Sequence, residues 1–88
     1  MAGMEYIFHG NVQGIGFRAH VKKKASELGI TGWVKNMDDG SVKAVFSGDP
    51  EMISILEAYC RKIPLSEITS VDSIPADNCK FETFEILK

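Results

Sequence analysis

The stretch GNVQGIGFR, residues 10–18, joins a run of apolar side chains to a segment with helical spacing. A glycine-rich loop between a strand and a helix directs several backbone N–H groups toward one place, and the helix start adds a partial positive charge. Arg18 adds a planar cation that can bind two oxygens at once. The stretch therefore predicts a pocket for a phosphate-sized anion, and the alternative is a tight turn beside a surface arginine.

Apolar periodicity on both sides of this stretch predicts the first half of the fold. Residues 4–9 combine aromatic and β-branched side chains, which favour a strand. Apolar residues recur at helical spacing over residues 17–28, and Gly29 stands where a C-terminal helix cap is expected. The next expected elements are a strand at 30–35, a hairpin turn DDG at 38–40 and a strand at 41–47.

A second helix is predicted after residue 49. Asp49 is the expected N-cap, because its side chain can accept a hydrogen bond from the first turn. Pro50 is the expected first helical residue, because the N–H that proline lacks would have no partner at that position. Pro64 is expected to end this helix. The expected apolar stripe comprises Met52, Ile53, Ile55, Leu56, Tyr59 and Ile63.

Two strands close the chain, at residues 68–74 and 81–87, and Phe84 and Ile86 are expected to face the core from the last one. Two helices with one apolar stripe each can cover one face of a mostly antiparallel sheet. The sequence thus predicts an α+β fold of the ferredoxin-like βαββαβ type with a short extra C-terminal strand. We interpret residues 1–88 as a single domain in which residues 1–3 could be a cloning remnant.

Composition excludes several classes of function. The chain has 88 residues, 44% of them hydrophobic and 25% charged, and a net charge of −2 argues against broad nucleic-acid binding. No apolar run is long enough to span a membrane, and no signal peptide is visible at the start. Cys60 and Cys79 form no metal-type cluster and fit a reducing cytoplasm, although a disulfide between them remains an alternative. We expect a cytoplasmic monomer that binds neither nucleic acid nor a membrane.

Two stretches resemble the signatures of the acylphosphatase family. Residues 10–18 resemble its pattern G-x-V-Q-G-V-x-F-R. The sequence GWVKN at 32–36, followed by GSV at 40–42 and by Gly48, resembles its second signature. Both motifs occur in the order and at the spacing of the family, and two motifs at the right separation are more specific than either alone.

The resemblance implies hydrolysis of the carboxyl–phosphate bond of an acyl phosphate, a small-molecule substrate, without a metal or other cofactor. The catalytic residues would be Arg18 and Asn36, with Asn36 holding the attacking water through a carboxamide that cannot ionise. If the first two strands lie near each other, Asn36 faces the loop across the strand ends. The implied phosphate-binding residues, acting through backbone N–H groups, are Gln13, Gly14, Ile15, Gly16, Phe17 and Arg18.

Three departures from the family pattern and several alternatives stand beside this interpretation. Asn11 stands where the family usually has Arg or Lys, Ile15 stands where it has Val, and Phe8 stands where it has a smaller aliphatic residue. The change at position 11 removes a positive charge near the pocket. Without the resemblance, Asn36 would be an ordinary asparagine before a turn. The main alternative is a non-catalytic module of the same fold that binds a phosphorylated metabolite or a protein. An RNA-binding domain would need aromatics in an RNP-type strand and a basic face, and the sequence has neither.

Overall fold

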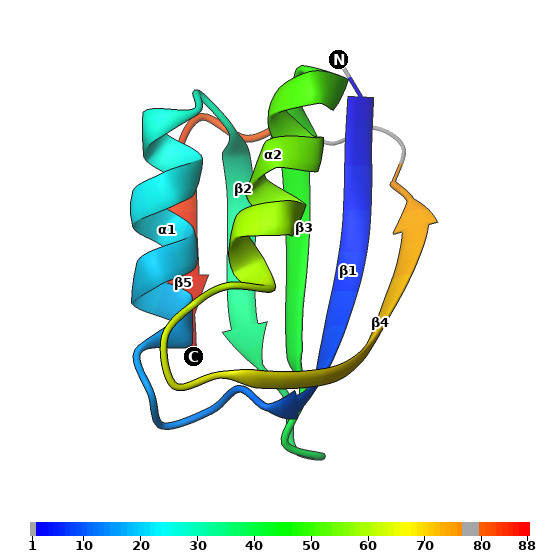
Figure 1. The fold of residues 1–88 in the computed structure, drawn as a ribbon. Helices are drawn as coiled ribbons and strands as arrows, with labels where there is room; N and C mark the ends of the chain where they lie inside the picture. Colours follow the sequence, from blue (N-terminus) through cyan, green and yellow to red (C-terminus); the bar gives the residue numbers. More distant parts are fainter. Residues whose placement is uncertain (1, 77–79) are drawn as a thin grey trace.

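A five-stranded sheet with two helices on one face forms the fold (Figure 1). The computed structural model describes residues 2–76 and 80–88. In chain order the elements are β1 (Ala2–Asn11), α1 (Phe17–Glu27), β2 (Thr31–Asn36), β3 (Val42–Gly48), α2 (Pro50–Cys60), β4 (Glu67–Pro75) and β5 (Phe84–Leu87). This order and layering confirm the predicted ferredoxin-like fold with an added C-terminal strand.

The strand order in the sheet is β4-β1-β3-β2-β5, so β3 lies at the centre. Neighbouring strands are antiparallel except β2 and β5, which run parallel. At the end of the sheet near the glycine-rich loop, Val42 of β3 is paired on one side with Phe8 and on the other with Asn36. The first two strands of the chain are therefore one strand apart and not direct neighbours.

Alternation along the central strands directs large apolar side chains toward the helices. On β1 and β3 these buried residues are Tyr6, Phe8, Val42, Ala44 and Phe46. Phe17, the first residue of α1, is also buried and packs on Phe8 with 5.5 Å between the ring centroids. This aromatic contact holds the start of α1, and hence the end of the preceding loop, against the sheet.

The expected helix signals are found at both helices. α1 ends at Glu27, and Gly29 follows with a φ of 71°, as expected for a C-terminal cap. At the start of α2 the Asp49 carboxylate accepts a hydrogen bond of 2.8 Å from the Glu51 N–H, and Pro50 is the first helical residue. The predicted N-cap of α2 is therefore confirmed.

The inner face of α2 differs from the predicted stripe. Ile55 is 44% exposed, so the prediction that it widens the stripe is wrong. The predicted Ile53 and Leu56 are buried, and Cys60, which was not predicted, is buried with them, because residues three and four apart share a helix face. The helix ends at Cys60, four residues before the expected stop at Pro64.

The last strand is shorter than predicted, and its two apolar residues have different surroundings. β5 begins at Phe84, which is buried in the core, whereas Ile86 is 36% exposed. Both side chains lie on the same face of the strand, since residues two apart share a face. Ile86, however, lies beyond the core, where it lines a pocket together with Arg18 and Ala19 of α1. The prediction that Ile86 joins the core is therefore wrong.

Of the two cysteines, the structure describes only Cys60. Cys60, on the inner face of α2, has no disulfide partner among the described residues, and burial raises the pKa of its thiol to about 12. Cys79 lies outside the described residues. Among the helices of the described ranges, none has the length and apolarity needed to cross a membrane.

Candidate active site

The loop between β1 and α1 presents unpaired backbone donors. Gly14 and Gly16 have φ of 76° and 79°, in the left-handed region that favours glycine. Gly16 caps α1, and its carbonyl accepts a hydrogen bond of 3.1 Å from the His20 N–H. No residue in the described part of the chain accepts a hydrogen bond from the N–H groups of Gly14, Ile15, Gly16 or Phe17. These donors at a helix start are suited to an anion.

Arg18, the second residue of α1, is oriented by the opposite end of the chain. Its Nη1 donates a hydrogen bond of 3.2 Å to the carbonyl oxygen of Leu87, the last residue of β5. This leaves the remaining guanidinium donors available to a ligand, because arginine carries five N–H groups. Sequence reasoning missed the contact, since a backbone carbonyl in a distant strand leaves no signature in residue identity.

Asn36, the last residue of β2, has an unusual hydrogen-bonding status. Its Oδ1 is the one buried side-chain nitrogen or oxygen that lacks a hydrogen-bond partner among the described residues. Leaving such an atom unpaired costs on the order of 1–3 kcal/mol. A buried acceptor kept at this cost is a candidate for binding a water molecule or a substrate group.

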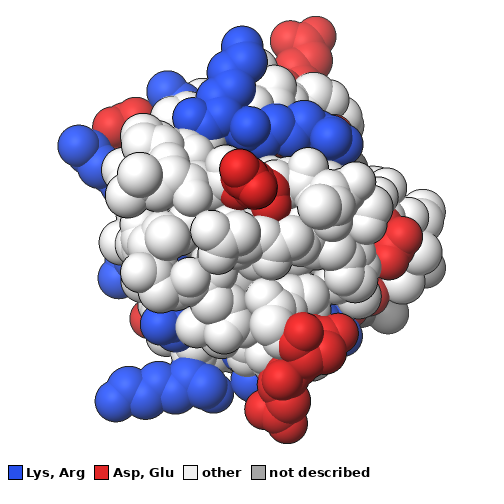
Figure 2. Space-filling view, turned by 60° about the horizontal axis from the view of Figure 1, so that its bottom comes forward, with Lys and Arg blue, Asp and Glu red and all other residues white. Residues whose placement is uncertain are grey.

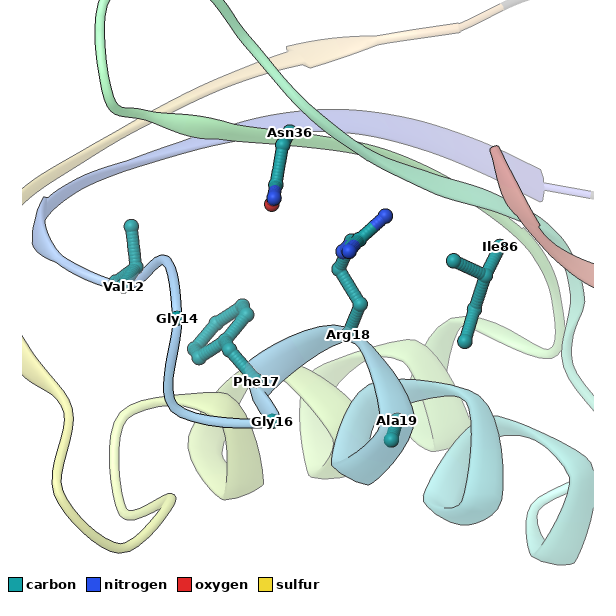
Figure 3. Close-up of a pocket in the computed structure, with 8 residues that line it drawn as sticks. All are labelled: Val12, Gly14, Gly16, Phe17, Arg18, Ala19, Asn36 and Ile86. Carbon is teal, nitrogen blue, oxygen red and sulfur yellow. The ribbon is translucent and has the colours of Figure 1, made fainter. Parts of the chain in front are cut away.

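Arg18 and Asn36 meet at one pocket of about 180 Å³. In Figure 3, Arg18 extends from α1 and Asn36 from β2, and their polar ends point toward the same space. The pocket is lined by Val12, Gly14, Gly16, Phe17, Arg18, Ala19, Asn36 and Ile86. The structure thus brings the two predicted catalytic residues together with most of the predicted loop.

Two predicted phosphate-binding residues, Gln13 and Ile15, do not line this pocket. Ile15 is partly buried against the hydrophobic core. The Gln13 side chain turns toward the hairpin turn after β2, where its Nε2 donates to the carbonyl oxygens of Met37 and Ser41 at 2.8 and 2.9 Å. Sequence reasoning considered only the backbone N–H of Gln13 and missed this role of its amide.

The electrostatic surroundings favour an anion in the pocket that Arg18 lines. A second hollow, on the turn side of Asn36, is lined by Lys35, Asp38 and Asp39, so that two carboxylates face one basic side chain and make this hollow less suited to an anion. Figure 2 brings forward the end of the molecule that is lowest in Figure 1: basic side chains lie along the upper edge and at the lower left, and acidic ones lie near the centre and at the lower right. Among the described residues that line the first pocket, Arg18 is the one that carries a charge, so it and the start of α1 favour an anion there.

Metal-ligating side chains are scattered over the described ranges, 2–76 and 80–88. Within them, no three His, Cys, Asp or Glu residues come together in a group that could hold a metal ion. His9 pairs instead with Asp72 of the neighbouring strand at 2.9 Å.

Comparisons with known proteins agree on one family. The family model described as acylphosphatase matches residues 4–86. An acylphosphatase of Thermoplasma volcanium is 45% identical over 80 residues, which cover 90% of this chain and 89% of the relative. An acylphosphatase of Picrophilus torridus is 46% identical over 81 residues, covering 92% of this chain and 96% of the relative. The crystal structure of acylphosphatase from Bacillus subtilis superposes with a TM-score of 0.95 at 29% identity, covering 100% of both chains.

Proposed function

This chain belongs to the acylphosphatase family, and we propose that Arg18, the loop amides and Asn36 carry out its reaction. The enzyme hydrolyses the carboxyl–phosphate bond of small-molecule acyl phosphates and releases a carboxylate and inorganic phosphate. Because the departing carboxylate is a good leaving group, the reaction needs little acid catalysis. It needs neutralised phosphoryl oxygens and a water molecule aligned for attack.

The phosphoryl group lies between the loop and Arg18 in this proposal. The unpaired N–H groups of the loop and the first turn of α1 hold its oxygens, and the Arg18 guanidinium adds charge-assisted hydrogen bonds. The contact between Arg18 and Leu87 supports this role, because it holds a long, flexible side chain at the pocket. Donors that are already in place cost little reorganisation when charge develops in the transition state.

Asn36 positions the attacking water. The observation that carries the proposal is its buried, unpartnered Oδ1 at the pocket that Arg18 also lines. This oxygen can accept a hydrogen from water and orient the water oxygen toward the phosphorus. Because a carboxamide does not take up the proton, a phosphoryl oxygen of the substrate receives it.

A direct assay tests the proposed reaction. The purified protein should release phosphate from acetyl or benzoyl phosphate, whereas a phosphate monoester such as p-nitrophenyl phosphate should be turned over far more slowly. The monoester carries a poorer leaving group, and no acid group is assigned here to protonate it. Phosphate binding without turnover of either acyl phosphate would contradict the proposal.

The remaining expectations concern the state of the whole protein. We propose that residues 1–88 act as one monomeric domain, since the described elements form one sheet with both helices on one face. The free, buried Cys60 thiol supports a reducing, cytoplasmic location. The net charge of −2 supports the absence of nucleic-acid binding. Sedimentation equilibrium at micromolar concentration tests the monomer.

A further inference from the structure

We propose that Gln13 is a positioning residue that fixes Asn36 relative to the phosphate-binding loop. The proposal rests on the function proposed above for Asn36 and goes beyond it, because Gln13 acts through its side chain and does not touch the substrate. Its amide links two segments, the loop at residues 12–16 and the turn at residues 37–41.

The Gln13 amide forms part of the hydrogen-bond network of the turn. Nε2 donates to Met37 O at 2.8 Å and to Ser41 O at 2.9 Å. The same two carbonyl oxygens close the turn internally, where they accept hydrogen bonds from the N–H groups of Gly40 at 3.2 Å and Met37 at 2.8 Å. Gln13 is thus bound to both ends of a turn that begins directly after Asn36.

The chemistry of these contacts requires a group like the glutamine amide. Two carbonyl oxygens converge on one atom, so that atom must carry two hydrogens, as an amide nitrogen does. Glutamate at this position would present an acceptor to two acceptors, and methionine would fill the space without donating. The partly buried position keeps competing water from much of the contact.

Sheet topology explains why such a link matters. The loop follows β1 and Asn36 ends β2, and β3 lies between these strands. Phosphate binding uses the loop and Arg18 alone, but attack by water requires the loop and Asn36 at a fixed separation. Misplacement by about 1 Å can cost on the order of a hundredfold in rate. Gln13 should therefore affect the chemical step more than phosphate binding.

The first test is the Gln13→Met variant, compared with the unsubstituted enzyme on benzoyl phosphate. We expect kcat to fall about tenfold or more, with the inhibition constant of inorganic phosphate changed less than about threefold. Ser66→Ala is the matched control, since it also removes a side-chain hydrogen bond to a loop carbonyl, at 2.6 Å, but in the segment that joins α2 to β4, which includes neither the loop at residues 12–16 nor the turn at residues 37–41. Equal kcat in Gln13→Met and the unsubstituted enzyme would overturn the proposal.

A double-mutant cycle separates this inference from the function on which it rests. If Gln13 acts through Asn36, then Gln13→Met should change kcat little in an Asn36→Ala background. Full additivity of the two losses overturns the role of Gln13 while leaving that of Asn36 intact. An unchanged kcat in Asn36→Ala itself would instead contradict the proposed function.

A measurement on the unsubstituted protein covers the case in which Gln13→Met fails to fold. The Gln13 side-chain amide protons, being donated to two carbonyls, should exchange with water more slowly than those of the exposed Asn11. Nuclear magnetic resonance on protein labelled with ¹⁵N measures both rates. Equally fast exchange at the two amides would show that the link is absent and would overturn the proposal.

Discussion

Gly10 and Gly32 stand where neighbouring strands approach too closely for any side chain. A Cβ at Gly10 would lie 2.0 Å from the carbonyl oxygen of Glu67, and one at Gly32 would lie 1.9 Å from that of Val45. Both glycines belong to the stretches that resemble the family signatures. The two stretches therefore contain glycines of two kinds. Gly10 and Gly32 allow neighbouring strands to pair, whereas Gly14 and Gly16 shape the loop, and residue spacing alone does not distinguish these roles.

The first residue-scale prediction concerns this close approach. Gly32→Ala should destabilise the fold by more than about 3 kcal/mol, because the new methyl group meets a backbone carbonyl at a φ of 137°. Gly29→Ala is the matched control, with a φ of 71° and nothing within 4 Å, and should cost only about 1 kcal/mol. Urea unfolding measures both. Similar losses for the two variants would mean that the clash is relieved by a small strand movement.

The second residue-scale prediction distinguishes Arg18 from Asn36. Asn36→Ala should lower kcat strongly and leave the inhibition constant of inorganic phosphate nearly unchanged, since its contact is made to water. Arg18→Ala should worsen both values, with kcat/KM reduced on the order of a hundredfold or more. Arg18→Lys should also be poor, because an ammonium cannot form two parallel hydrogen bonds.

The control for all three variants is circular dichroism, which confirms that each one is folded. Near-normal kcat in folded Asn36→Ala would reduce that residue to a turn asparagine. Near-normal kinetics in Arg18→Lys would show that Arg18 acts only as a charge.

At the scale of elements, periodicity predicted the order of strands and helices, and single residues indicated the C-terminal cap of α1 at Gly29 and the N-cap of α2 at Asp49. It placed Ile55 and Ile86 wrongly, because a local pattern identifies apolar faces without showing where a neighbouring element stops covering them. The contacts of Arg18 with Leu87 and of Gln13 with the turn were also beyond prediction. Each joins a side chain to a backbone carbonyl, and every residue type has such a carbonyl.

The turn between β2 and β3 gives an element-scale prediction. Hydrogen bonds from the Ser41 hydroxyl at 2.5 Å and from its N–H at 2.9 Å lower the pKa of the Asp39 carboxyl. Because the folded pKa lies below the unfolded one, the ionised carboxylate stabilises the fold above the ordinary Asp pKa of about 3.9. This contribution is lost as pH falls through the folded pKa.

Asp39→Asn should therefore lower the Tm at pH 7, and its difference from the unsubstituted protein should shrink below about pH 4. Asp38→Asn, at the adjacent exposed carboxylate, is the control and should show a smaller effect at pH 7. Differential scanning calorimetry across this pH range measures both variants. A difference that stays constant down to pH 2 would mean that the charge of Asp39 contributes nothing.

At the scale of the whole molecule, the pocket draws on three distant parts of the chain, namely the β1–α1 loop with α1, the end of β2, and β5. The phosphoryl charge is balanced in our proposal by Arg18 and backbone donors, which are intrinsic to the chain. Activity should therefore persist undiminished after EDTA treatment and dialysis, as measured by phosphate release. Loss of activity that Mg²⁺ or Zn²⁺ restores would show that a metal takes part.

The strand order β4-β1-β3-β2-β5 also bears on how quickly the enzyme can form. Only β2 and β3 are paired across a short turn, whereas β1 must find β3 and β4, and β5 must find β2, across long intervening segments. Such pairings lose chain entropy before they gain contacts, and they slow folding relative to helical proteins of similar size. Since Arg18 is held by β5, a half-folded chain carries the loop without an oriented guanidinium. Catalysis should thus return only with the final closure of the sheet, which makes hydrolysis itself a kinetic reporter of complete folding.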